Sequence, residues 1–319
     1  EMCIRDRYVT RRLVGQARET LRTVGKPGLH LAGYPLNAKA YVLEAMLHPD
    51  LIRFTDSVGC VPLSPGYKID YDVFTSHWVA KEYGCIVRSS SSGMVGGFTG
   101  GVESTVLCVI AAILISWTFL GADIMFPTVS DILRKKAYND AKLTWARSLI
   151  LQALSRNTNL KIWIPVGTVA DHGSELHFME GIIGYLSLIT SGIDMVSPGG
   201  RGPICKKGNI GGPLSIKWGI NISTAASKLK RSEASEIVKK CMEKHVPKEK
   251  LENLTGYEGL TFEEAYELET LNPRDKILEE ALTRPALRFK EITVNLGATY
   301  RRERNIQTEL QRLPHRLIF

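Results

Sequence analysis

Short runs of β-branched and aromatic residues alternate along the chain with stretches in which apolar residues recur at helical spacing. The pattern predicts strands over 28–34, 51–58, 85–90, 122–127, 161–167 and 192–198, and helices over 36–48, 69–83, 101–120, 138–156 and 174–190. Strands that alternate with helices are typical of βαβ units and a parallel sheet. Six such units in a row favour an α/β fold of the (β/α)₈ TIM-barrel type that lacks its first one or two βα units. A doubly wound sheet stays open as the alternative, since the period alone does not separate the two folds.

The chain divides into four parts by pattern. We expect the barrel units in 8–212 and additional helices packed on the barrel in 213–297, where Thr261 and Glu264 are spaced as a capping box. Residues 298–319 hold five Arg and two Glu and form a basic tail of unassigned origin. Residues 1–7, EMCIRDR, resemble a translated sequencing adapter, so we leave them out of the fold and expect part of the N-terminus to be missing.

Composition narrows the class of protein. The chain has 319 residues, 44% of them hydrophobic, and a net charge of +8. Its six cysteines include no C-x-x-C pair, which argues against a metal site or a disulfide framework and favours a cytoplasmic protein. Basic residues are not interleaved with aromatics on one face, so nucleic acid is not an expected partner. The apolar run 106–120 is shorter than a membrane span, and we expect a fully buried helix and no membrane contact.

A serine- and glycine-rich segment, SSSSGMVGGFTGGVEST at 89–105, follows one predicted strand and leads into a helix. Gly96 and Gly101 have the glycine spacing of a phosphate loop, but Val102 and Glu103 stand where that loop needs Lys and Ser or Thr. A carboxylate at the helix start repels phosphate, so we interpret the segment as a close-packed turn at the end of a barrel strand.

A second polar segment, VADHGSELHFME at 169–180, lies just past the strand predicted over 161–167. Asp171, His172 and Glu175 are candidates for acid–base or metal-assisted chemistry, because their spacing allows them to converge. A capped, solvated helix start is the alternative interpretation of the same residues.

Several motifs in order resemble one enzyme family. The segments are KIDYD at 68–72, GGFTGGVEST at 96–105, SGIDMVSPGGRG at 191–202 and GLTFEEAYELETLNP at 259–273. Together they resemble the monomethylamine methyltransferases of methanogens, over about residues 10–297. The resemblance implies a (β/α)₈ barrel, cytoplasmic and homo-oligomeric, that acts in methanogenesis. It implies the transfer of a methyl group from a small methylated amine to the cobalt of a separate corrinoid protein, with the corrinoid carried by that partner.

The catalytic residues of the family are not matched. Its pyrrolysine position falls at Ala32, in KPGLHLAG at 26–33, so we expect no pyrrolysine here. The two glutamates near pyrrolysine fall at Gly59 or Cys60 and at Ser90, and a glutamine falls near Leu160. No catalytic residue is therefore carried over, and the matched positions are Asp70, Asp72, Gly97, Gly101 and Glu103.

Loss of these groups changes the expected substrate. A quaternary ammonium group already has a neutral leaving group, so a site without pyrrolysine could demethylate it by positioning alone. Tyr34 and Trp163 are candidate walls of an aromatic cage for such a cation. The full set of candidate substrate-binding residues is Tyr34, Ser90, Gly97, Gly101, Glu103 and Trp163. The alternatives are a barrel enzyme using Asp171, His172 and Glu175 without corrinoid, and a non-catalytic barrel that binds a small molecule.

Overall fold

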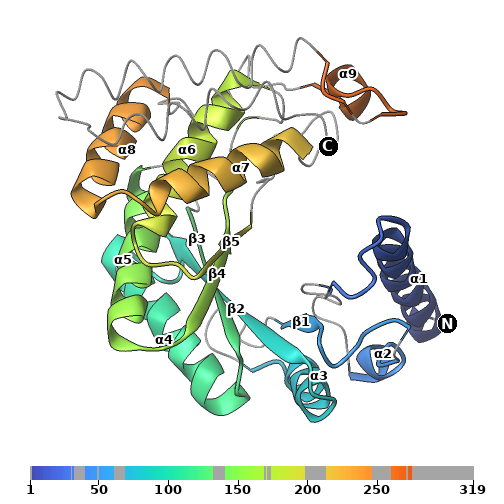
Figure 1. Ribbon diagram of the computed structural model, residues 1–319. Helices are drawn as coiled ribbons and strands as arrows, with labels where there is room; N and C mark the ends of the chain where they lie inside the picture. The colour runs from blue at the N-terminus through green and yellow to red at the C-terminus, as the bar shows by residue number, and fades with distance from the viewer. Residues whose placement is uncertain are drawn as a thin grey trace.

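The described part of the chain has five parallel strands in one curled sheet, and they lie side by side in the order in which they occur along the chain (Figure 1). The structure is a computed structural model. It describes residues 2–29, 31, 40–48, 50–60, 69–131, 141–168, 170, 174–197, 213–245, 260–270 and 272–274.

The strands are β1 (Ser57–Cys60), β2 (Ile86–Val95), β3 (Ile124–Asp131), β4 (Lys161–Pro165) and β5 (Met195–Ser197). The helices are α1 (Met2–Thr23), α2 (Ala40–Glu44), α3 (Tyr71–Glu82), α4 (Val102–Leu120), α5 (Ala141–Asn157), α6 (Glu175–Ile189), α7 (Pro213–Ala226), α8 (Arg231–His245) and α9 (Phe262–Ala265).

Among the described residues, one helix lies between each pair of neighbouring strands, from β1–α3–β2 to β4–α6–β5. A sheet that grows in one direction with right-handed crossovers keeps its connecting helices on one side. Figure 1 shows α3 to α6 following the outer side of the curled sheet. This arrangement confirms the barrel-type winding and excludes the doubly wound sheet, in which the strand order reverses.

The hydrophobic core lies between the strands and these outer helices. Buried side chains alternate along β2 and β3, so every second residue faces the helices and the residues between face the concave side. Met125 and Ile162 belong to the larger buried cluster, whereas Val58 and Val87 belong to a second cluster around α1 and α2. The concave face therefore carries polar side chains such as Arg88 and Ser90, aromatic rings, and aliphatic side chains such as Ile86 and Ile124.

Strand β2 is longer than the sequence predicts, because it runs through the serine-rich segment as far as Val95. Gly93 explains how α4 can pack so closely on this strand. A Cβ atom there would lie 2.6 Å from Thr105 Cγ2 and 2.7 Å from Val109 Cγ2. The close-packing role expected for glycine in this region is thus played by Gly93, and the turn begins only at Gly96.

Helix α4 corrects the expectation of a short, fully buried apolar run. It has 19 residues, and by length and composition it is the one described helix that could cross a membrane. Only 33% of its most apolar window is buried, and Leu107, Trp117 and Phe119 are exposed. One face packs on β2 and β3, and the outer face carries the exposed apolar side chains.

Aspartates just before β3 and β5 tie neighbouring strands together at their N-terminal ends. Asp123 Oδ2 accepts the Val87 N–H at 2.8 Å, and Asp194 Oδ2 accepts the Ile162 N–H at 3.0 Å. Each aspartate also binds a lysine ammonium group, Lys81 at 2.8 Å for Asp123 and Lys161 at 3.1 Å for Asp194.

Other parts of the chain depart from the sequence-based expectation or extend beyond it. The hydrophobic pattern does not predict α1, which includes residues 2–7. The capping box of Thr261 and Glu264 is present at α9. The assignments of 1–7 as an adapter remnant and of 298–319 as a basic tail stay predictions.

Candidate functional site

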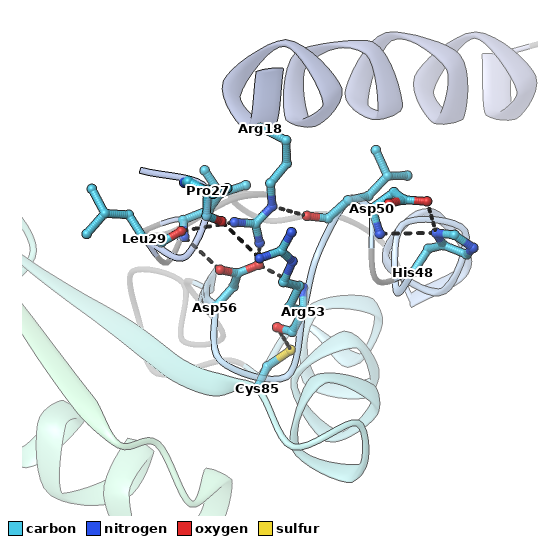
Figure 2. Close-up of polar contacts among 10 residues, drawn as sticks. Arg18, Pro27, Leu29, His48, Asp50, Arg53, Asp56 and Cys85 are labelled. Carbon is cyan, nitrogen blue, oxygen red and sulfur yellow. Dashed lines mark hydrogen bonds and ion pairs between the residues drawn. The ribbon is translucent and has the colours of Figure 1, made fainter. Parts of the chain in front are cut away.

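A buried arginine on α1 holds the segment that leads to residue 32 (Figure 2). The Arg18 guanidinium donates from Nε to the Leu51 carbonyl at 2.8 Å and from Nη1 to the Leu29 carbonyl at 3.0 Å. Its Nη2 forms an ion pair with Asp56, and both side chains are buried. Burial lowers the pKa of Arg18 from its ordinary value, and the Asp56 charge opposes that shift.

Asp56 occupies the same place before β1 that Asp123 and Asp194 occupy before β3 and β5. Its Oδ1 accepts the Leu31 N–H at 2.7 Å, and its Oδ2 accepts the Arg53 N–H at 2.7 Å. The Ser57 N–H in turn donates to the Leu31 carbonyl at 3.0 Å. Leu31 is thus bonded to the start of β1, but residues 28 and 29 form a turn and a bend, and the rest of the strand predicted over 28–34 lies outside the described residues apart from Leu31. Ala32 and Tyr34 lie outside the described residues.

The concave face of the sheet brings two candidate residues onto neighbouring strands. The register places Ser90 opposite Phe126, and the ring centroids of Phe126 and Trp163 are 4.6 Å apart in an edge-to-face contact. Thr128 follows Phe126 on this face, and its hydroxyl donates to the Ser91 carbonyl at 3.0 Å. Ser90 and Trp163 thus lie on the same face, separated by the strand that carries Phe126.

A residue that the sequence did not single out crosses this face. Arg88 on β2 reaches past β3, and its Cζ atom lies 4.1 Å from the centroid of the Trp163 ring. Guanidinium groups stack on aromatic rings through cation–π attraction. The ring that we predicted as a wall for a substrate cation is therefore already in contact with a cation of the chain itself. The only sequence signal was a basic residue inside an apolar, β-branched run.

The glycine turn after β2 directs its backbone N–H groups inward. Gly96 N–H donates to the Gly100 carbonyl at 2.7 Å, and Gly97 N–H donates to the Met94 carbonyl at 3.1 Å. Both Gly96 and Gly100 have φ +77°, a conformation open to glycine at little cost. Glu103 is exposed in the first turn of α4. Because these amides are engaged within the turn, the geometry supports a tight turn and not a phosphate cradle.

The β4–α6 connection is held by a histidine that is not among the candidates. His177 Nδ1 lies 2.9 Å from Thr168 Oγ1, and its Nε2 lies 2.9 Å from Ser215 Oγ on α7. The Thr168 hydroxyl donates to the Ala170 carbonyl at 3.0 Å, so the network is satisfied when Nδ1 carries the proton. Burial lowers the pKa of His177 to about 4, so the ring is neutral at pH 7. We assign it a structural role.

Of the acid–base candidates, the structure describes only Glu175, the first residue of α6. Asp171 and His172 lie outside the described residues. Ser174 caps the helix by accepting the His177 N–H, as the alternative interpretation of this segment expects. The helix start is not solvated as that interpretation also expects, because Ser174 and His177 are buried and Glu175 is half-buried. A further buried carboxylate, Glu180, accepts the Ala170 N–H at 2.9 Å. Within the described part of the chain, no three His, Cys, Asp or Glu residues come together as a metal site would need.

The singly wound parallel sheet, with its connecting helices on the outer side, defines an α/β protein of the (β/α)₈ barrel class. The crystal structure of monomethylamine methyltransferase MtmB from Methanosarcina barkeri has a similar fold, with a TM-score of 0.79 at 16% identity. The crystal structure of the hydroxylamine complex of MtmB matches this chain with the same TM-score and the same sequence identity. In both, the match covers 90% of this chain and 61% of the other chain. No curated protein sequence matches the chain.

The model of the monomethylamine methyltransferase MtmB family matches residues 8–283. The chain therefore belongs to this family, and it spans about three fifths of the length of the two crystal structures.

Proposed function

We propose that the chain transfers a methyl group from a methylated amine to the cobalt of a reduced corrinoid carried by a partner protein, without pyrrolysine. The family match over residues 8–283 is the observation that carries this proposal. The similar fold of the two MtmB crystal structures supports it.

The chemistry limits what the site must do. The methyl carbon forms its new bond with the electron pair of cobalt(I), and the carbon–nitrogen bonding pair stays on nitrogen. The amine then leaves as a neutral molecule only if its nitrogen was protonated or quaternary before transfer. With Ala32 at the family's pyrrolysine position, an imine adduct is not available from that residue. What the protein can still contribute is to hold the methyl donor in line with the cobalt. Such positioning can account for a large share of an enzyme's rate acceleration.

The concave face is the surface that suits this role. Parallel barrels place their functional residues at the C-terminal ends of the strands. In this sheet the partly exposed inner side of β2, β3 and β4 carries Ser90, Phe126 and Trp163, which lie near the middle of their strands and before those ends. The acid–base alternative stays open, because Asp171 and His172 lie outside the described residues.

The test is a methyl-transfer assay with the purified 319-residue chain, a reduced corrinoid protein and a panel of methylated amines. We expect the absorbance of cobalt(I) to be replaced by that of methyl-cobalt(III) with at least one donor, and ammonium as the unmethylated control to give no change. Absence of methyl-cobalt with every donor contradicts the proposal and favours a binding protein.

A further inference from the structure

A groove lies between α5, α8 and the C-terminal end of α6, and none of the residues that line it is on a strand. Helices α5 and α8 both pack on α6, and the cavity between them has a volume of about 360 Å³, which is in the range of sites for small molecules. Packed helices normally fill the space between them with interlocking side chains. Here six of the lining side chains are too small to do so, namely Ala141, Ser148, Ser187, Ser191, Ala234 and Ser235.

Hydroxyl groups from α5 and α6 line part of the groove. Thr144 is 8% exposed, and its hydroxyl has no hydrogen-bond partner among the described residues. Ser187 and Thr190 donate to carbonyl groups of their own helix, at 2.6 Å and 2.7 Å, so that their oxygen atoms can still accept a hydrogen bond. A buried hydroxyl without a partner is unfavourable, and a ligand that reaches Thr144 removes that penalty.

The α8 side of the groove is basic at one end. Arg231 and Lys239 line it and are exposed, and among the described residues neither side chain makes a hydrogen bond or an ion pair. Glu243 is the one acidic side chain in the lining, and it lies about 18 Å from Arg231 along the helix axis. A ligand with an acidic group therefore meets positive charge along most of α8.

Aromatic and apolar side chains form the rest of the lining. Trp145 on α5 is 45% exposed, so part of its indole ring is open to a ligand. Val238 and Met242 on α8 also line the groove. Aromatic rings stack favourably on one another, and a flat apolar group suits this part of the groove.

We propose that this groove binds a small organic anion that carries a planar ring. Its acidic group pairs with Arg231 or Lys239, its ring rests against Trp145, and its polar atoms reach the hydroxyl groups of α5 and α6. Carboxylates and phosphates share this chemistry, and the test separates them. The site goes beyond the proposed methyl transfer, because no residue of the concave face lines it.

The test is a ligand-observed NMR titration of the full chain with two matched pairs of probes. Indole-3-acetate is paired with the neutral indole-3-acetamide, and adenosine monophosphate is paired with adenosine. We expect at least one acidic probe to bind about 10-fold more tightly than its neutral partner, which is the effect of one charge-assisted hydrogen bond. Inorganic phosphate and acetate, which have no ring, should bind more weakly than that probe. Equal affinities within both pairs overturn the inference, as does binding of phosphate or acetate as tight as that of the acidic probes.

Variants locate the binding to the groove. R231Q and K239Q each remove one charge, and we expect at least one of them to weaken the acidic probe about 10-fold while the neutral partner is unchanged. R156Q removes an exposed arginine of α5 that does not line the groove, and it is the matched control. W145L should weaken both members of the pair, whereas W78L, which removes a ring with 46% exposure on α3, should not. Affinities of R231Q and K239Q that both equal that of R156Q overturn the inference, and so do equal affinities for W145L and W78L.

Discussion

Replacing Arg18 by methionine leaves the Asp56 carboxylate buried without its cation, and we expect a large loss of stability. Breaking a buried ion pair by removing one partner costs about 3–5 kcal/mol, because the charge left behind is uncompensated. Arg18 makes two further hydrogen bonds, to the carbonyl groups of Leu29 and Leu51, and both are lost. Asp56 keeps its bonds from the Leu31 and Arg53 N–H groups, which limits the loss.

The matched control is one turn further along α1. The Arg22 Nη1 atom lies 3.4 Å from Glu19 Oε2, and its Nη2 atom lies 3.5 Å from Asp50 Oδ1. The Arg22 side chain is about half exposed. Because exposed ion pairs contribute only about 0–1 kcal/mol, R22M should stay close to the parent. Both variants replace arginine by methionine on the same helix. A difference between their free energies of unfolding is therefore not due to helix propensity.

The assay is urea unfolding followed by far-UV circular dichroism at pH 7, together with amide hydrogen exchange at Leu31. We expect R18M to lower the free energy of unfolding by several kcal/mol, and the double variant R18M/D56N to be less destabilised than the sum of the single variants. We also expect faster exchange at Leu31 in D56N, since its N–H donates to that carboxylate. An R18M variant within about 1 kcal/mol of R22M would refute the reasoning from burial.

Three further outcomes follow from packing and titration. G93A should cost about 1–3 kcal/mol because its methyl group overlaps Thr105, while G28A, where nothing lies within 4 Å, should change little in the same urea titration. Burial lowers the pKa of both His77 and His177 to about 4, from 6.5 for the ordinary group. Between pH 4 and 6.5 the unfolded chain therefore binds more protons than the folded one. The free energy of unfolding should fall as the pH drops through this window, by up to about 3 kcal/mol for each ring. A free energy of unfolding that does not change over this window contradicts the prediction. Neither ring nitrogen of His77 makes a hydrogen bond of ordinary geometry, although contact with the Leu120 backbone opposes the lowering of its pKa. H77L should therefore be neutral or stabilising and should make the pH profile less steep, and strong destabilisation contradicts this.

The sequence predicted the winding of the sheet because each unit carries its own local signals. Asp123 and Asp194 precede short apolar runs, IMF at 124–126 and MV at 195–196, and the longer segments between the strands have the length and composition of helices. The end of β2 was misplaced because a run of four serines lacks β-propensity, and strand pairing with β3 from Arg88 to Val95 overrides that local preference.

The site was predicted less well, since its contacts join residues far apart in the chain. Ser90 and Trp163 were identified and lie on one face, but the stacking of Arg88 on Trp163 depends on a side chain that crosses an intervening strand. The ion pair between Arg18 and Asp56 likewise joins α1 to the start of β1. The hydrophobic pattern near either residue does not indicate this pair. Buried polar pairs of this kind are visible only after the fold brings them together.

The most direct test of the central claim is the fate of a labelled methyl group. The full chain is incubated with a reduced corrinoid protein and ¹³C-methyl donors that include methylamine and N-methylglycine, and the corrinoid is analysed by mass spectrometry. The account predicts a ¹³C-methyl group on cobalt that depends on the chain, with at least one of the donors. Labelling no greater than in a reaction without the chain, for every donor, contradicts it.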